Sequence, residues 1–89
     1  MVTMLIQHHV KDYAAWKKVF DLNKGLRTSK GELSAKVYHD SQDNNQLTVM
    51  NTWENLKNAQ DFVNSPELKA AMANAGVDGH PEITFLNEF

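Results

Sequence analysis

The chain has 89 residues, a net charge of −2, 42% hydrophobic and 22% charged residues, and no cysteine. This length fits one domain, and without cysteine there are no disulfides, thiolate nucleophiles or thiolate metal sites. The nine Lys and Arg residues are scattered, so the basic stripe that nucleic-acid binding requires is missing.

The apolar runs are short. None approaches the roughly 20 residues of a membrane span, and Met4–Ile6 is too short for the core of a signal peptide. Together with the lack of cysteine, this predicts a cytoplasmic protein with no membrane partner.

The first predicted elements are a strand and a helix. Residues 3–10 form the strand, and Asp12 follows as a helix N-cap whose carboxylate accepts from backbone amides. Aromatic residues then recur at helical spacing and are expected on the inner face of the helix: Tyr13, Trp16 and Phe20. Gly25 is expected to end this helix, and the polar stretch to Gly31 is expected to be a loop.

The middle of the chain predicts a hairpin. Residues 32–39 alternate as a strand, with Leu33 and Val37 expected on one face. Residues 40–45 are turn formers, and residues 46–53 form the next strand.

The last part predicts a helical region and a strand. Asn55 starts the helical region, which is expected to turn Leu56 and Phe62 inward, and Ser65–Glu67 is a strong restart signal with proline at the first helical position. Gly76 closes the helical region. The final strand is predicted over residues 83–89.

The element order is therefore strand–helix–strand–strand–helix–strand. Right-handed crossovers place both helical regions on one face of a four-stranded antiparallel sheet of order 4-1-3-2, an α+β ferredoxin-like fold. The other face mixes apolar with small hydroxyl residues, which is unusual for a wet surface. We expect this open face to pair with a second copy in a homodimer.

Four stretches carry a family resemblance: Val10–Trp16 with Phe20, Thr52–Glu54, Phe62–Leu68 and Pro81–Phe85. They resemble the dimeric α/β-barrel superfamily and, within it, the antibiotic-biosynthesis-monooxygenase-like proteins. The resemblance covers nearly the whole chain as a single domain, residues 1–89. It implies cofactor-free monooxygenases, haem-degrading enzymes, stress proteins and many proteins of unknown role as relatives.

The haem-degrading branch can be tested against the sequence. Its members place a histidine nine or ten residues after a tryptophan such as Trp53, whereas this chain has Phe62 and Val63 there. The first strand offers Gln7 or His8 where those enzymes use an asparagine. The resemblance therefore weighs against haem degradation, and no cofactor is expected.

Histidine is the expected general base, because its pKa lies near neutrality. The topology gathers His8, His39 and His80 at one rim of the sheet, with His8 and His39 on the helix side as catalytic candidates. His8 and His39 are two strand spacings of about 4.8 Å apart and do not share a metal without distortion. His8 with His80 is the easier pair, but no third ligand follows, so no metal is expected. His9 alternates to the dimer side, and each histidine also has a purely structural interpretation.

An apolar pocket between the helices and the sheet is the expected ligand site. Asn51 and Trp53 fall at the end of the sheet away from His8. Trp53 also has an interpretation as a residue of the hydrophobic core. Arg27, in the predicted loop, either holds an anionic group or is solvated, and Glu32 and Glu67 are expected to be solvated or capping. The candidate substrate-binding residues are Tyr13, Trp16, Phe20, Asn51, Trp53, Phe62, Met72 and His80.

Three functional hypotheses stay open. The first is a cofactor-independent monooxygenase-like enzyme for a small aromatic or polyketide-like molecule, in which His8 or His39 assists proton removal. The second is a non-catalytic small-molecule-binding or stress-response dimer. The third is a structural partner domain whose pocket is filled by side chains.

Overall fold

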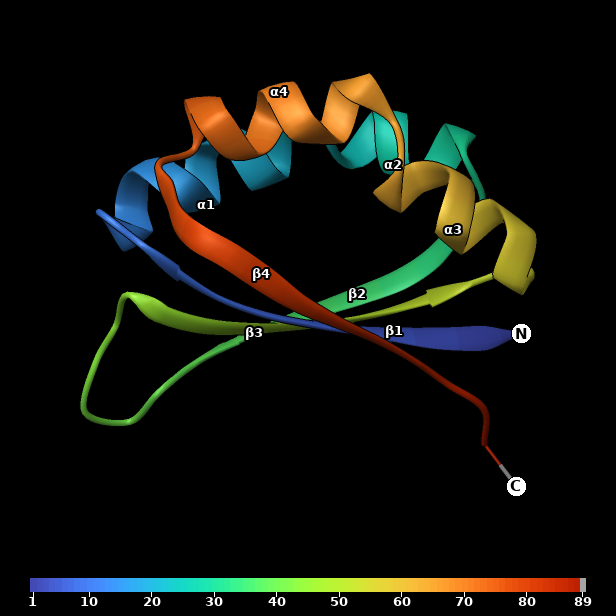
Figure 1. Cartoon of the computed structure of the whole chain (residues 1–89), viewed down its shortest axis with the longest axis horizontal. Helices are drawn as coiled ribbons and strands as arrows, with labels where there is room; N and C mark the ends of the chain where they lie inside the picture. Colours follow the sequence, from blue (N-terminus) through green and yellow to red (C-terminus); the bar gives the residue numbers. More distant parts are fainter. Residues whose placement is uncertain (89) are drawn as a thin grey trace.

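The computed structural model describes residues 1–88 as one layer of helices on one sheet (Figure 1). The elements are β1 (Val2–Val10), α1 (Tyr13–Leu22), α2 (Lys24–Ser29), β2 (Glu32–His39), β3 (Gln46–Trp53), α3 (Leu56–Val63), α4 (Pro66–Asn74) and β4 (Val77–Leu86). The sheet order is β2-β3-β1-β4, with all neighbours antiparallel. The predicted ferredoxin-like topology is confirmed.

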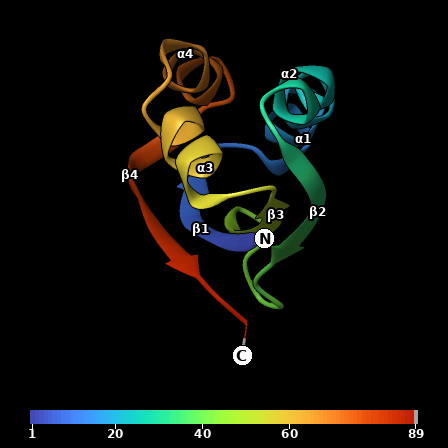
Figure 2. The ribbon, with the colours of Figure 1, turned by 90° about the vertical axis from the view of Figure 1, so that its right-hand side faces the viewer.

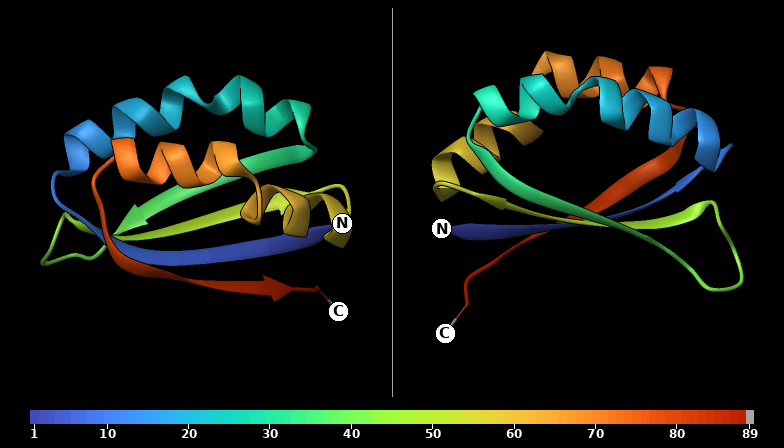
Figure 3. Two further views of the ribbon diagram at one scale, coloured as in Figure 1. Left: turned by 45° about the horizontal axis from the view of Figure 1, so that its top comes forward. Right: turned by 180° about the vertical axis from the view of Figure 1, so that it is seen from behind.

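The helices form two arms on the same face of the sheet. In Figure 2 the α1–α2 arm lies on the side of β2, and the α3–α4 arm lies on the side of β4. The central strands β1 and β3 run beneath the space between the arms, and both views of Figure 3 show the opposite face without helices. Side chains of β1 and β3 therefore form the floor of that space.

The helix starts follow the predicted capping chemistry. The Asp12 carboxylate accepts from the Ala15 amide at 3.3 Å, and the Asn55 side chain accepts from the Asn58 amide at 2.8 Å. Ser65 caps α4 by accepting from the Leu68 amide, with proline at the first helical turn. Such caps satisfy amides that have no partner within the helix.

The predicted loop between Gly25 and Gly31 is wrong, because the structure continues there as α2. The Arg27 amide donates to the Asn23 carbonyl at 3.0 Å, which restarts the helix after a short break. Glycine weakens a helix by only about 1 kcal/mol relative to alanine. The Arg27 side chain is 5% exposed, and its hydrogen bonds to Glu32 and to the Phe20 carbonyl tie α2 to β2 and α1.

The start of β2 also differs from the expected alternation. The register shifts between Glu32 and Ser34, so Glu32 is buried at 8% exposure and Leu33 is 54% exposed. Such a bulge turns one residue out of the alternating pattern. Gly31 precedes it with φ of +111°, a conformation that favours glycine, and a Cβ there would also lie 2.7 Å from the Asn58 side chain.

The final strand is longer at its beginning than predicted. β4 starts at Val77. Its pairing with β1 is irregular between Gln7 and His9, because Gly79–Pro81 lie opposite a single residue of β1. Of the predicted strand over residues 83–89, Phe89 lies outside the described residues. Leu56, which was expected to face inward, is 45% exposed.

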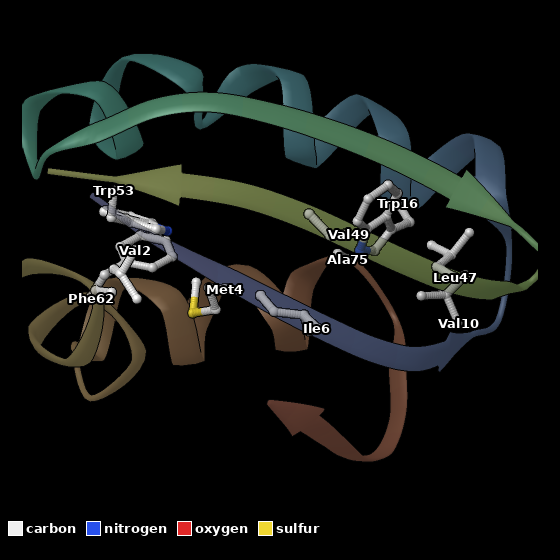
Figure 4. Close-up of a cluster of buried hydrophobic side chains, with 11 residues drawn as sticks. Val2, Met4, Ile6, Val10, Trp16, Leu47, Val49, Trp53, Phe62 and Ala75 are labelled. Carbon is white, nitrogen blue, oxygen red and sulfur yellow. The ribbon is translucent and has the colours of Figure 1, made fainter. Parts of the chain in front are cut away.

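The core lies between the helices and the sheet (Figure 4). Val2, Met4, Trp53 and Phe62 gather at one end, and the Trp53 and Phe62 rings are 4.9 Å apart between centroids. Trp16 packs further along, and Leu47 and Val10 close the far end. Across residues 1–88, no helix is long and apolar enough to span a membrane.

Candidate functional site

A cavity of about 70 Å³ lies between the two helical arms and the central strands. One ordered water needs about 10–15 Å³ on this kind of measure, so the space holds several waters or part of a small ligand. Its lining is mainly apolar, with aromatic walls from Trp16, Phe20 and Phe62. The third hypothesis, a structural partner domain, predicts that side chains fill this space, and the cavity does not fit that prediction.

The floor of the cavity carries two polar residues among apolar ones. Alternate positions of β1 and β3 face the helices, and these are Val2, Met4, Ile6, His8, Val10, Leu47, Val49, Asn51 and Trp53. Only His8 and Asn51 in this set have polar side chains other than the Trp53 indole. Because buried polar groups are unfavourable unless bonded, these two positions are the first candidates for function.

His8 is 6% exposed and lies against the Trp16 indole, with 5.7 Å between ring centroids. Neither of its ring nitrogens has a hydrogen-bond partner among residues 1–88. Burial lowers the pKa of His8, because removal from water disfavours the charged imidazolium. His8 is therefore neutral at neutral pH, with one nitrogen as donor and the other as acceptor.

Asn51 is 1% exposed, and its Nδ2 donates to Glu32 Oε2 at 3.0 Å. Its Oδ1 atom has no hydrogen-bond partner within the described chain. Glu32 in turn accepts from Arg27 Nε through both carboxylate oxygens, at 3.0 and 3.1 Å. The three residues form one buried chain of hydrogen bonds beside the cavity.

The structure corrects the two expectations about this ion pair. Arg27 is neither in a loop nor solvated: its Nη1 donates to the Phe20 carbonyl at 2.6 Å, and its guanidinium lies 3.7 Å from the Phe20 ring centroid. Glu32 is buried rather than solvated. Glu32 neutralises Arg27 at close range, so the guanidinium is not an unpaired charge available to bind an anionic ligand.

The structure places the predicted site residues in two groups. Six of them line the cavity: His8, Trp16, Phe20, Asn51, Phe62 and Met72. The other four lie outside its lining: Tyr13, His39, Trp53 and His80. His8 and Asn51, which were expected at opposite ends of the sheet, border the same space.

The four outside residues have other surroundings. His39 is exposed, its ring is T-shaped to the Tyr13 ring with 5.6 Å between centroids, and its Nδ1 hydrogen-bonds the Asp40 carbonyl. Trp53 is completely buried, and His80 is exposed on β4. His9 Nδ1 lies 3.2 Å from Asp78 Oδ2, and His9 does not line the cavity.

The candidate substrate-binding residues left out the lining residues Asn23, Leu26 and Arg27, although Arg27 was considered as a holder of an anionic group. A signal for them was present, because Trp16, Phe20, Asn23 and Arg27 continue one helical period through Gly25. Treating Gly25 as a stop interrupted that pattern. Glu67, at the rim, was expected to be solvated, and it is half-exposed with its carboxylate 3.9 Å from Lys30 Nζ.

Within residues 1–88, no three His, Asp or Glu side chains come together as a metal-binding group. The polar groups of the cavity are thus a neutral imidazole, a fixed carboxamide and a neutralised ion pair. The chemistry that such an arrangement supports is proton exchange and hydrogen bonding with a ligand in a mainly apolar setting.

Comparison with known proteins identifies a family model that matches most of the chain. The family model for antibiotic biosynthesis monooxygenase matches residues 2–74. Among curated proteins, none matches the chain at a significant level.

Solved structures share the fold over almost the full length. A proposed antibiotic biosynthesis monooxygenase of Bordetella bronchiseptica aligns with a TM-score of 0.84 at 13% identity, covering 99% of this chain and 96% of that one. SnoaB of Streptomyces nogalater, described as a cofactor-independent oxygenase, aligns with a TM-score of 0.81 at 13% identity, covering 99% and 92%. A proposed antibiotic biosynthesis monooxygenase of Caulobacter crescentus aligns with a TM-score of 0.78 at 19% identity, covering 99% and 89%. At these identities the structural likeness shows the fold alone.

Proposed function

Since the chain belongs to the antibiotic biosynthesis monooxygenase family, we propose that it is a cofactor-independent oxygenase for a small aromatic or polyketide-like molecule. The observation that carries the proposal is His8, a buried and neutral imidazole without a protein partner among residues 1–88, in the wall of an apolar cavity. The description of SnoaB, which has the same fold, supports the reaction class.

The reaction that suits this site begins at an acidic C–H bond. An example is the methylene in the central ring of an anthrone, which lies between two aromatic rings and across the central ring from a carbonyl group. His8 accepts the proton, and the electron pair stays on carbon, delocalised into the rings. The carbanion gives one electron to O₂, and the two radicals join as a peroxide. Loss of the second C–H proton and cleavage of the O–O bond give a ketone and water. The methylene loses two hydrogens and gains one oxygen, and the other oxygen leaves as water.

The cavity supports each requirement of this chemistry. Its aromatic walls, Trp16, Phe20 and Phe62, offer flat apolar surfaces to a ring system. The low pKa of His8 keeps the imidazole unprotonated and able to act as a base. A ligand that displaces water from this mainly apolar space would limit side reactions of the carbanion and peroxide.

The open face of the sheet supports a homodimer. Tyr38 is 50% exposed, Leu86 41% and Met50 38%, and half-buried Leu5 lies beside Met50 across the β1–β3 ladder. Contiguous exposed apolar side chains of this kind mark interaction sites. Two such faces packed about a two-fold axis would bury both.

Turnover tests the catalytic proposal. The purified protein is mixed in air with an anthrone that carries phenolic hydroxyls, and oxygen consumption and quinone absorbance are followed. His8→Leu should lower kcat about 100-fold or more, since a positioned general base contributes about 10²–10⁴. The matched variant His39→Leu should retain most activity, because His39 lies outside the cavity. Equal losses in both variants, or ligand binding without turnover by the unaltered protein, would contradict the proposal.

Mass in solution tests the dimer. The unaltered chain should run at twice the 10.1 kDa chain mass in light scattering. Met50→Glu places a charge on the open face and should shift the population to single subunits, whereas Lys57→Glu on α3 should not. A monomer at micromolar concentration for the unaltered chain would refute the dimer.

A further inference from the structure

We infer that Asn51, held by Glu32 and Arg27, is a specificity-determining residue that selects ligands with a neutral hydrogen-bond donor, such as a phenolic hydroxyl. The inference rests on the proposed function for the reaction that follows binding. The binding preference itself depends only on the geometry of the cavity.

The orientation of the Asn51 carboxamide is fixed by its neighbour. A carboxylate paired with a guanidinium only accepts hydrogen bonds, so Glu32 requires a donor from Asn51. The Nδ2–Oε2 distance of 3.0 Å shows that the amide nitrogen meets this demand. Oδ1 is then directed away from Glu32, because the two amide atoms lie on opposite branches of the same planar group.

The remaining Oδ1 is a buried acceptor with no partner among residues 1–88. Asn51 lines the cavity, so a water or a ligand in the cavity can satisfy this acceptor, and a ligand that displaces the water must replace its hydrogen bond. A buried acceptor left unmet is unfavourable. A ligand that donates a hydrogen bond gains affinity here, and one that cannot donate gains none.

The charges behind Asn51 decide against an anionic ligand. Glu32 neutralises Arg27 through two hydrogen bonds from Nε, and the Arg27 Nη1 is taken by the Phe20 carbonyl. A ligand carboxylate near Asn51 would meet the Oδ1 acceptor with the Glu32 charge behind it. Desolvation would add to this repulsion, since the cavity is apolar.

The spacing of the two polar floor residues adds a constraint on ligand shape. Asn51 pairs with Met4, and His8 lies four residues further along β1, about 13 Å of strand. The apolar pair Ile6 and Val49 lies between them. The site therefore suits an elongated ring system with its hydroxyl at the Asn51 end and its reacting carbon at the His8 end.

Matched ligands test the preference without any reaction. We would titrate the full chain at neutral pH with 2-naphthol, 2-methoxynaphthalene and 2-naphthoate by calorimetry. The naphthol should bind about fivefold or more tighter than the ether, as expected for one hydrogen bond to a buried acceptor, and the naphthoate should bind weakest. Equal affinity of naphthol and ether, or tightest binding of the naphthoate, would overturn the inference. This comparison on the unaltered chain is decisive even where a variant fails to fold.

Variants assign the preference to Asn51. Asn51→Leu should bring the naphthol-to-ether ratio within about twofold of one. The double variant Arg27→Met with Glu32→Gln removes both charges together and should also weaken the ratio, because a neutral carboxamide at position 32 pairs with either orientation of the Asn51 amide. His8→Leu and the exposed control Glu82→Gln should keep it. A ratio that persists in Asn51→Leu but disappears in His8→Leu would assign the donor preference to His8 and overturn the inference.

The two proposals fail separately. A strong donor preference without quinone formation would leave the inference standing and remove the oxygenase. Quinone formation with equal affinities for naphthol and ether would leave the oxygenase standing and remove the inference about Asn51.

Discussion

The space between the helices and the sheet has a filled end and a hollow middle, although both rest on the same strands. At the filled end, Trp53 packs on Phe62 with Val2 and Met4 beside it (Figure 4). In the middle, the helix α4 side contributes the small residue Ala71, with Ala75 just beyond its end, opposite the aromatic wall. The two regions differ in what lies over the strands: the rings of Trp53 and Phe62 fill one end, whereas in the middle the side chains of the two arms, Ala71 among them, leave a space.

Both regions also hold a buried polar atom without a partner in residues 1–88. Trp53 Nε1 is such an atom in the filled end, and Asn51 Oδ1 is one in the middle. Trp53 does not line the cavity, whereas Asn51 does. An unmet polar atom therefore points to a ligand only where there is space beside it.

Emptying the filled end should have the largest effect. Trp53→Ala removes a completely buried side chain and should lower the free energy of unfolding by about 3–5 kcal/mol. Urea denaturation measures this change, and Trp53→Phe should cost less. A loss below about 1 kcal/mol would mean that this end is not tightly packed.

Filling the hollow middle should affect binding rather than stability. Ala71→Leu extends a cavity-lining side chain into the space, and we expect naphthol affinity to fall about tenfold or more while the unfolding midpoint stays the same or rises. Ala70→Leu, exposed on the same helix, is the matched control. Unchanged affinity in Ala71→Leu would place ligands elsewhere.

Acid should weaken the fold through His8. Burial lowers the pKa of His8 in the folded chain, whereas the unfolded chain takes up the proton near pH 6.5. Between these two pKa values the unfolded state binds more protons, so stability is complete above about pH 6.5 and is lost as the pH falls, by up to about 1.4 kcal/mol per pH unit. Denaturation curves of the unaltered chain and His8→Leu across this range isolate the effect, because the other histidines are present in both. Parallel pH dependence of the two proteins would rule out this source.

A surface ion pair outside both regions should matter least. Lys17 Nζ and Asp21 Oδ1 are 2.6 Å apart on the outer side of α1, with side chains 38% and 60% exposed. Asp21→Asn should change stability by no more than about 0.5 kcal/mol, as for other exposed pairs of this spacing. A loss above about 1 kcal/mol by denaturation would show that α1 depends on its outer face.

The hydrophobic period predicted more of the fold than of the site. The strands at 32–39 and 46–53 and the caps Asp12, Asn55 and Ser65 were predictable because each depends on neighbours in sequence. His8 was predictable as a helix-facing residue for the same reason. The helix α2 was missed because a single glycine was given more weight than the period that runs through it.

The sequence by itself determined the order of strands and helical regions and which residues of the central strands face the helices, because alternation and capping are local properties. The right-handed crossover rule then gave the sheet order. Only the tertiary structure decided that Glu32 is buried, that it joins Arg27 to Asn51, and that His8 and Asn51 border one cavity. A bulge in β2 and the spacing of two helical arms produce those contacts. They depend on residues far apart in the chain, which no local pattern records.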